Sequence, residues 1–228
     1  MGKTHIILLL CAFCTLPTIQ AQQTAFDEFR KEAGDYAALY TGKAEVSYNM
    51  QKFLNHPYWG TEEFYNGSIH YNGWLYTDLQ LRYDTYKKLL IVVTPNKQTA
   101  LQVDLRKVDY FVINDRKFVQ QGDNYAALLY QSTQLCLTQY IVTTLRSQVK
   151  KEDFYYSQFK KNVFFNLHKD GADYTLSSRS DFLKLFPSIK KQLKAYCRKE
   201  KLDFGEDSRA QAMLALTRYT DSLIHKQP

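Results

Sequence analysis

Apolar and polar residues alternate with a period of two in the central part of the chain. The alternation runs through Asp78–Asp84 and returns over Leu101–Arg106, as expected for strands that bury one face and expose the other. Leu89–Val93 is a continuous apolar run that ends before Pro95, so it predicts a strand buried on both faces. Val108–Ile113 predicts another strand.

The same part of the chain contains further strands and the turns between them. Strands are expected near Tyr125–Tyr130, Gln134–Leu145, Phe154–Leu167 and Tyr174–Leu176. Turns are expected at Tyr65-Asn66-Gly67, Tyr71-Asn72-Gly73, Asn114-Asp115 and Asp170-Gly171. Because the connections are short and contain no helical pattern, the strands are expected to pair antiparallel.

The C-terminal part changes to a helical pattern. Apolar residues recur at helical spacing from Phe182 to Cys197, and Ser180 is a candidate N-cap. Pro187 suits the first turn of a helix, so a short helix or turn is expected before it and a longer helix after it. Another helix is expected over about Ser208–Ile224.

These elements together predict an α+β fold that is mainly antiparallel β. The strands are expected to form a meander in a strongly bent sheet or a partly open barrel, followed by two C-terminal helices. We expect a single domain over residues 22–228, whose helical segment spans about 180–226. A chain of this length can bury a core without disulfides.

The first 21 residues have the layout of a secretory signal peptide. Lys3 precedes the apolar run Ile6–Phe13, Pro17 ends that run, and Ala21 is a small residue suited to cleavage. The run is too short to span a bilayer, and no later run approaches the roughly 18 apolar residues that a spanning helix needs. The mature protein is therefore expected to be exported to the periplasm, the outer-membrane surface or the medium. A short helix is expected near Thr24–Glu32.

The chain is basic, which bears on its partners. It has 30 Lys and Arg against 23 Asp and Glu, a net charge of +7, and loss of Lys3 with the signal leaves +6. In an exported protein such a charge suits acidic envelope polymers or anionic lipid headgroups rather than nucleic acid, and a solvated lysine surface, which we favour, also accounts for it. The sequence does not indicate an oligomeric state.

Two cysteines remain after the signal, Cys136 and Cys197. Export permits a disulfide between them, and both positions also suit buried thiols that pack as small apolar groups.

No motif predicts catalysis, a metal site or a cofactor. The four histidines after the signal are scattered, without the spacing typical of zinc ligands. Ser-x-x-Lys occurs three times, as expected in a lysine-rich chain, and its companion catalytic motifs are missing. Asp78 and Asp84 are expected on the wet face of a strand, not as a facing pair of catalytic carboxylates.

Aromatic residues are concentrated between His56 and Tyr76. Tyr58, Trp59 and Trp74 are the candidates for a ligand-binding surface, because Tyr and Trp favour interfaces and stack on flat ligands. Cross-strand packing of the same rings is the alternative.

Several short segments, in this order, resemble a group of uncharacterised exported proteins of the Bacteroidota. They include His56-Pro57-Tyr58, Gly67–Gly73, Leu79–Asp84, Phe182–Pro187 and Lys199–Phe204, and the resemblance covers nearly the whole mature chain. It implies a Gram-negative envelope setting and supplies no activity or catalytic residues. Tyr130-Gln131-Ser132 departs from the expected pattern, because it lacks a glycine for a turn.

The functional hypothesis is a non-enzymatic envelope protein that binds through its β-rich domain. As a carrier of an apolar ligand it would have a sizeable apolar cavity, and as a protein-interaction module it would have a filled core and an exposed aromatic patch. The alternative is a hydrolase of polysaccharide or peptidoglycan, with two facing carboxylates in a cleft.

Overall fold

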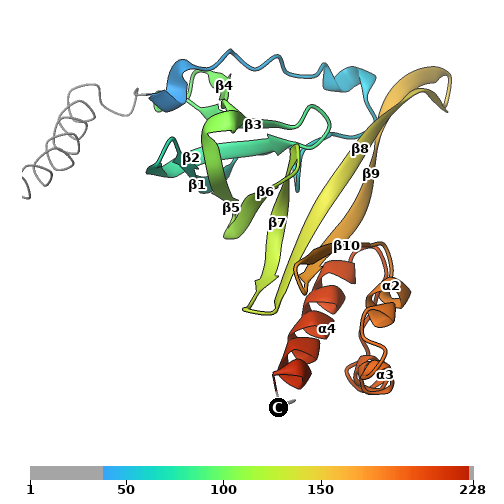
Figure 1. Ribbon diagram of the computed structural model, residues 1–228. Helices are drawn as coiled ribbons and strands as arrows, with labels where there is room; N and C mark the ends of the chain where they lie inside the picture. The colour runs from blue at the N-terminus through green and yellow to red at the C-terminus, as the bar shows by residue number, and fades with distance from the viewer. Residues whose placement is uncertain (1–37, 226–228) are drawn as a thin grey trace, which may run out of the picture. The chain divides into compact units, whose positions relative to one another are not determined.

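The computed structural model describes residues 38–225, and most of them belong to one ten-stranded antiparallel sheet with helices after it (Figure 1). The signal segment and the helix expected near Thr24–Glu32 lie outside these residues. The chain divides into two compact units, Met1–Thr41 and Gly42–Pro228. The described part of the first is a single 3-10 turn, η2 (Ala38–Thr41).

The ten strands pair only with antiparallel neighbours. In chain order they are β1 (Tyr65–Tyr71), β2 (Trp74–Asp84), β3 (Leu89–Val93), β4 (Ala100–Gln102), β5 (Val108–Ile113), β6 (Arg116–Gln121), β7 (Asn124–Gln131), β8 (Leu135–Lys151), β9 (Phe154–Lys169) and β10 (Ala172–Leu176). Their order across the sheet is β10-β9-β8-β7-β6-β5-β1-β2-β3-β4, so β10 and β4 are the outermost strands and the sheet is not closed. The predicted antiparallel meander is confirmed.

The sheet consists of two meanders joined through β1 and β5. The chain runs outward from β1 to β4, returns through the 3-10 helix η4 (Leu105–Lys107), and places β5 beside β1 on the other side. At this junction Gly67 lies opposite Ile113, and a Cβ on Gly67 would lie 2.1 Å from the carbonyl oxygen of Val112. A side chain would therefore force the two strands apart, so the junction requires glycine.

A first core fills the bend of β1–β7. Phe111 and Phe118 face each other across β5 and β6 with stacked rings 4.7 Å apart. Tyr83 from β2 and Tyr125 from β7 pack on Phe111 at 5.5 and 5.1 Å. The phenol of Tyr125 donates to the carbonyl of Val108, which satisfies its polar end inside the core.

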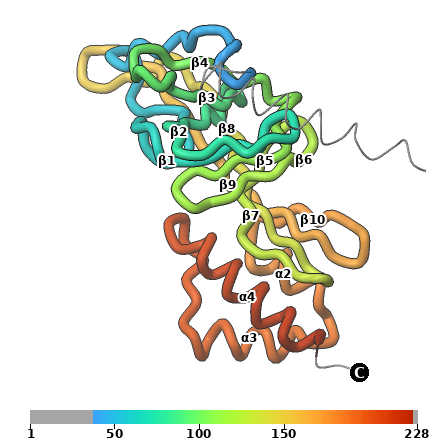
Figure 2. The backbone as a smooth tube through the Cα atoms, turned by 90° about the vertical axis from the view of Figure 1, so that its left-hand side faces the viewer, coloured from blue at the N-terminus to red at the C-terminus, as the bar shows by residue number. Residues whose placement is uncertain are grey.

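A second core lies between the ends of β7–β10 and three helices (Figure 2). The helices are α2 (Arg179–Lys184), α3 (Lys190–Lys199) and α4 (Arg209–Ile224). Phe165 and Leu167 of β9 meet Phe182 of α2, Leu193 of α3 and Met213 of α4 there, all fully buried. Among the described residues no helix is long and apolar enough to cross a membrane.

Several predicted elements are confirmed. Leu90, Ile91 and Val92 of β3 are at most 1% exposed, as the continuous apolar run predicted for a strand buried on both faces. The turns at Asn114-Asp115 and Asp170-Gly171 have positive φ at both residues, as a two-residue hairpin turn requires. A short helix precedes Pro187, a longer one follows it, and α4 covers the segment predicted from Ser208.

Three local predictions are wrong. Tyr65-Asn66-Gly67 is not a turn: it begins β1, because its glycine serves the close approach to β5. The strand predicted from the alternation over Leu101–Arg106 ends already at Gln102. The Asp104 carboxylate accepts the backbone N–H of Arg106 and caps η4, which replaces the rest of that strand. The N-cap of α2 is Ser178 rather than Ser180. Ser178 Oγ accepts the backbone N–H of Asp181 and donates its own hydrogen to the Asp181 carboxylate, which lowers the pKa of that carboxyl group.

Gly67→Ala is expected to lower the free energy of unfolding by about 3 kcal/mol, the upper end for overpacking, since the new methyl group meets backbone. Gly122→Ala is the control: φ is +57° there and no atom lies within 4 Å of a Cβ. It is expected to cost only the backbone strain, about 1 kcal/mol. Urea unfolding measures both, and equal losses would contradict the steric requirement at Gly67.

Candidate functional site

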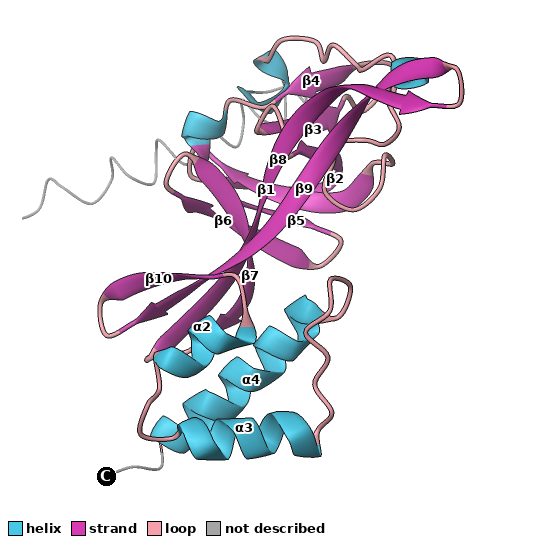
Figure 3. Cartoon of the chain, turned by 90° about the vertical axis from the view of Figure 1, so that its right-hand side faces the viewer, coloured by secondary structure: helices cyan, strands magenta, loops and turns pink. Residues whose placement is uncertain are grey.

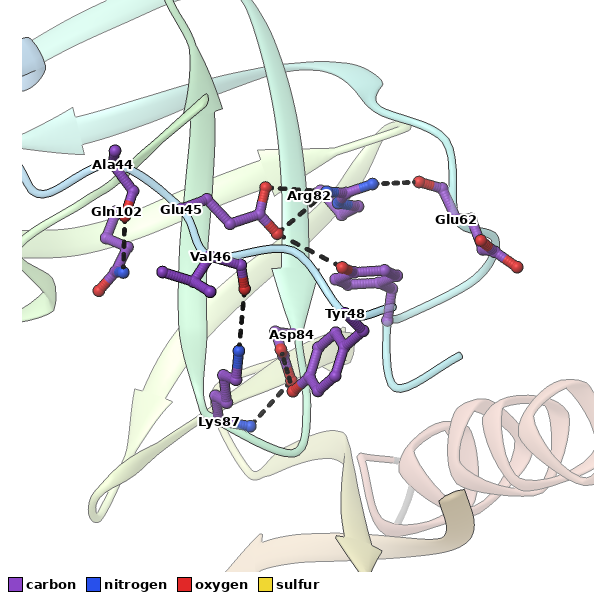
Figure 4. A network of polar contacts seen from close by, with 10 residues as sticks. Ala44, Glu45, Val46, Tyr48, Glu62, Arg82, Asp84, Lys87 and Gln102 are labelled. Atoms are coloured by element: carbon purple, nitrogen blue, oxygen red, sulfur yellow. Dashed lines mark hydrogen bonds and ion pairs between the residues drawn. The ribbon is translucent and has the colours of Figure 1, made fainter. Parts of the chain in front are cut away.

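Residues 43–58, called the strap here, run from one sheet edge to the β8–β9 hairpin. Ala44 forms an isolated antiparallel bridge to Leu101 of β4, and Phe53 forms a parallel bridge to Ser157 of β9. Between these points the strap passes over β2 and contains one 3-10 turn, η3 (Met50–Lys52). It brings polar side chains onto the end of β2 (Figure 4).

A buried ion pair lies where the strap crosses β2. Arg82 Nη2 lies 3.0 and 2.9 Å from the two carboxylate oxygens of Glu45, and Nη1 donates to the carbonyl of Glu62 at 2.6 Å. The two side chains are only 12% and 6% exposed. The guanidinium also lies 4.0 Å from the ring centre of Tyr58 and 4.1 Å from that of Phe64. Two aromatic faces and one carboxylate therefore surround this cation.

Asp84, at the end of β2, is a second buried carboxylate. One oxygen accepts the backbone N–H groups of Tyr86 and Lys87, both at 2.8 Å. The other accepts the phenol of Tyr48 at 2.8 Å. Burial and this bond raise the pKa of Tyr48. Lys87 Nζ lies 4.0 Å from the Tyr48 ring centre and donates to the carbonyl of Val46, which ties the strap to the β2–β3 turn.

The network continues into the β8–β9 hairpin. Lys161 of β9 donates to the carbonyl of Tyr58, and burial lowers the pKa of its ammonium group. Thr85 and Thr143 share a hydrogen bond of 2.6 Å between their hydroxyls, and Thr85 also donates to the carbonyl of Pro57. The strap, β2 and the hairpin are thus joined by buried polar contacts.

These contacts overturn the expected wet face at the end of β2. Arg82 and Asp84 were predicted to face solvent, but the strap covers them and leaves Asp84 1% exposed. The carboxylates of Glu45 and Asp84 already hold a cation and three donors, respectively. The arrangement is suited to holding the strap in register, and neither carboxylate is left without a partner to serve as a base.

The three aromatic residues predicted to bind a ligand occupy different places. Tyr58 is buried between the strap and β2, 3% exposed. Trp59 packs edge-on against Phe118 at 5.1 Å and bonds through its backbone to Tyr83 near one end of β2. Trp74 starts β2 at the opposite end. Tyr58 and Trp59 thus pack against other side chains, and the structure does not gather the three rings on one surface.

Of the two states left open for the cysteines, the structure has the free thiols. Cys197 of α3 is buried in the second core, where it packs as a small apolar group. Cys136 of β8 lies opposite Gln131 of β7 and His168 of β9 in the sheet. Burial raises the pKa of both thiols, which makes them poor nucleophiles.

Asp221 of α4 contacts a serine and a histidine, but the three residues do not form a catalytic triad. Its carboxylate accepts Tyr130 OH at 2.7 Å and Ser132 Oγ at 3.0 Å, and lies 3.4 Å from His225 Nε2. The serine bonds to the carboxylate itself, whereas a triad requires it to bond to the histidine. The cluster attaches α4 to the β7–β8 turn. Within residues 38–225 no group of three or more His, Cys, Asp or Glu could hold a metal ion.

Three open clefts of about 710, 670 and 630 Å³ lie on the surface of the described chain. Each contains a single carboxylate among its lining residues: Glu206, Asp203 and Asp115, respectively. None of these clefts presents the two facing carboxylates that the hydrolase alternative requires. The first cleft is rich in cations from β8, β9 and α4.

The distal half of the β8–β9 hairpin exposes large apolar side chains. Phe154 and Tyr155 at its tip are 65% and 69% exposed, and Val142 and Leu145 of β8 are also exposed. These four residues, which lie on both faces of the hairpin because side chains alternate along a strand, are called the hairpin surface here. The sequence signal was present in the aromatic residues at 154 and 155, but periodicity alone assigned them to an ordinary strand.

Arg82→Met is expected to lower the free energy of unfolding by about 3–5 kcal/mol, because it leaves the buried Glu45 carboxylate without its cation. Adding Glu45→Met should recover a large part of that loss, since the unpaired charge is then removed as well. Arg106→Met is the control, because its side chain is 89% exposed and its ion pair with Asp104 is screened by water. An Arg82→Met variant as stable as the control would refute the role of the pair.

The protein is expected to unfold at alkaline pH as its buried tyrosines ionise. Burial raises the pKa of Tyr58, Tyr83 and Tyr125 to about 12, against about 10 in an unfolded chain. A raised folded pKa gives a contribution to stability that is complete below pH of about 10 and is lost as the pH approaches about 12. Tyrosinate absorbance and far-ultraviolet circular dichroism should change together in this window. Full ionisation with the sheet intact would contradict the expectation.

Comparison of the chain with protein-family models, curated proteins and solved structures finds no match in any of the three. Its function is therefore argued from its own geometry.

Proposed function

We propose that this protein is a non-catalytic binding protein of the bacterial cell envelope, which engages a protein partner through the hairpin surface. The N-terminal signal pattern supports the setting. The observation that carries the binding role is the exposure of four large apolar side chains beside an unpaired strand edge on the β8–β9 hairpin.

The unpaired edge belongs to β8. Pairing with β7 ends at Gln139, and no strand of the described chain pairs with this edge between Tyr140 and Lys151. An open edge accepts an extended segment of another protein through main-chain hydrogen bonds. The bulge between Arg146 and Val149 interrupts the edge, so the regular part available to a partner spans residues 140–146.

The tip residues suit an interface anchor. Phe154 and Tyr155 follow the turn of the hairpin directly, and nearly two thirds or more of each side chain is in contact with solvent. Buried aromatic side chains contribute most of the binding energy in typical interfaces, surrounded by a polar rim. Lys150 and Lys151, opposite them on β8, provide such a rim.

The packing favours a protein partner over an apolar ligand held inside the fold. Phe111, Phe118 and Tyr125 fill the bend of the sheet, and helices α2–α4 fill the space under β7–β10. The three clefts described above are open and lined largely by polar and charged residues. A carrier would instead bury most of its ligand in an apolar cavity.

A photo-cross-linking amino acid at Tyr155, in the cells that naturally make the protein, should give one defined product with another protein. Tyr174, an exposed tyrosine on β10 at the other sheet edge, is the matched control and should give none. The substitution Phe154→Ser should weaken binding of the captured partner protein about 30-fold, which corresponds to the loss of one interface anchor of about 2 kcal/mol.

Two outcomes would contradict the proposal. Identical products from positions 155 and 174 would mean that the cross-link reports chance encounters. A product of two copies of this chain would mean that the hairpin serves self-association.

A further inference from the structure

The cleft of about 710 Å³ lies between the β8–β9 ribbon and the N-terminal end of α4, which points toward the ribbon (Figure 3). Its cations come from three segments: Arg146 from β8, Lys160 and Lys161 from β9, and Arg209 from α4. Glu206 is its one acidic lining residue. We call it the basic cleft.

The cations of the basic cleft lack acidic partners in the described part of the chain. No ion pair within residues 38–225 includes Arg146, Lys160 or Arg209. Arg209 uses Nε for the carbonyl of Phe204, and Lys161 uses Nζ for the carbonyl of Tyr58. Neither of these bonds neutralises a charge. Like charges gathered in a concave surface focus the positive potential, and a bound anion relieves their repulsion.

The start of α4 adds to this potential. Ser208 makes no side-chain cap, and the first turn contains no acidic residue. The partial positive charge of the helix end therefore faces the cleft together with Arg209. An arginine at this end is unfavourable toward the helix dipole, and its bond to Phe204 uses Nε only, so its two Nη groups remain for an anion.

The neutral residues of the cleft indicate what kind of molecule carries the negative charge of the ligand. Gln158 and Asn162 offer amide groups at the wall, and Phe164 presents a half-buried ring supported by Tyr140 at 5.5 Å. Amide groups and an aromatic ring together suit the hydroxyls and the flat faces of sugars. The volume lies within the usual range for small-ligand sites.

We propose that the basic cleft binds an acidic oligosaccharide, whose carboxylate, sulfate or phosphate groups contact Arg146, Lys160 and Arg209. The basic cleft adjoins the hairpin surface, because Arg146 belongs both to the cleft and to the open edge of β8. Oligosaccharide binding by the isolated chain requires no protein partner, so it is tested independently of the function proposed above.

Isothermal titration calorimetry of the full chain tests this with a tetragalacturonate, a sulfated heparin tetrasaccharide, inorganic phosphate and neutral maltotetraose. We expect at least one acidic oligosaccharide to bind, more weakly as ionic strength rises, and maltotetraose not to bind. Which acidic probe binds separates carboxylate from sulfate as the recognised group. Failure of both, or phosphate binding as tightly as the better oligosaccharide, would overturn the proposal.

Variants locate the site. Lys160→Gln with Arg209→Gln should weaken binding about tenfold for each cation removed, as expected for the loss of one charged hydrogen bond. Lys107→Gln with Lys191→Gln makes the same change of net charge at exposed positions outside the cleft, and should change affinity less than about twofold, since distant charges are screened. Equal losses in the two pairs would show a general charge effect and refute the site.

Arg209→Glu distinguishes binding from folding. An acidic residue in the first turn of α4 is favourable for the helix and offsets the lost bond from Arg209 Nε to the carbonyl of Phe204, so the melting temperature should change little. The same change reverses a charge in the cleft and should abolish binding of the acidic oligosaccharide. Lost binding together with a lower melting temperature would assign Arg209 a structural role instead.

Discussion

The pairing of β1 with β5 is the contact on which the rest of the sheet depends, because it joins two meanders that are otherwise separate. It requires the backbone of Gly67 to approach Val112 more closely than any side chain permits. Once β1 lies beside β5, β2 and β3 continue the sheet on one side and β6 to β10 continue it on the other. The strap can then reach from β4 to β9, since both lie on the same folded unit.

The buried ion pair of Arg82 and Glu45, rather than apolar packing alone, holds the strap on β2. Taking Arg82 and Glu45 out of water costs free energy, which their attraction and the two flanking rings offset. Such a pair adds little net stability compared with well-packed apolar residues. It does penalise any shift of the strap along β2, because a shift leaves both charges buried and unpaired. This is consistent with a role in fixing the register of a segment that forms only isolated bridges with the sheet.

Sequence periodicity predicted the antiparallel meander and the C-terminal helices, since both follow from local patterns that tertiary contacts left unchanged. Periodicity failed where a segment distant in the sequence changed the environment of a residue. Asp84 alternates with apolar residues as an exposed residue does, yet the strap buries it. Gly67 follows Asn66 as in a turn, yet it lies within β1. Its lack of a side chain allows the close approach to β5, more than forty residues away. The site residues Glu45, Arg82 and Lys161 form no motif, so only the folded chain brings them together.

The chain treats its cations in two physically different ways. Arg82 is removed from water and is therefore paired, because an unpaired buried charge would cost more than the fold can supply. Arg146, Lys160 and Arg209 of the basic cleft remain in contact with water, which screens their repulsion well enough to let them stay without acidic partners within residues 38–225. An excess of lysine and arginine in a sequence cannot separate these cases, nor either of them from a solvated surface. Position does separate them: Arg82 lies against Glu45 inside the fold, whereas Arg209 lines the open basic cleft and takes part in no ion pair within residues 38–225.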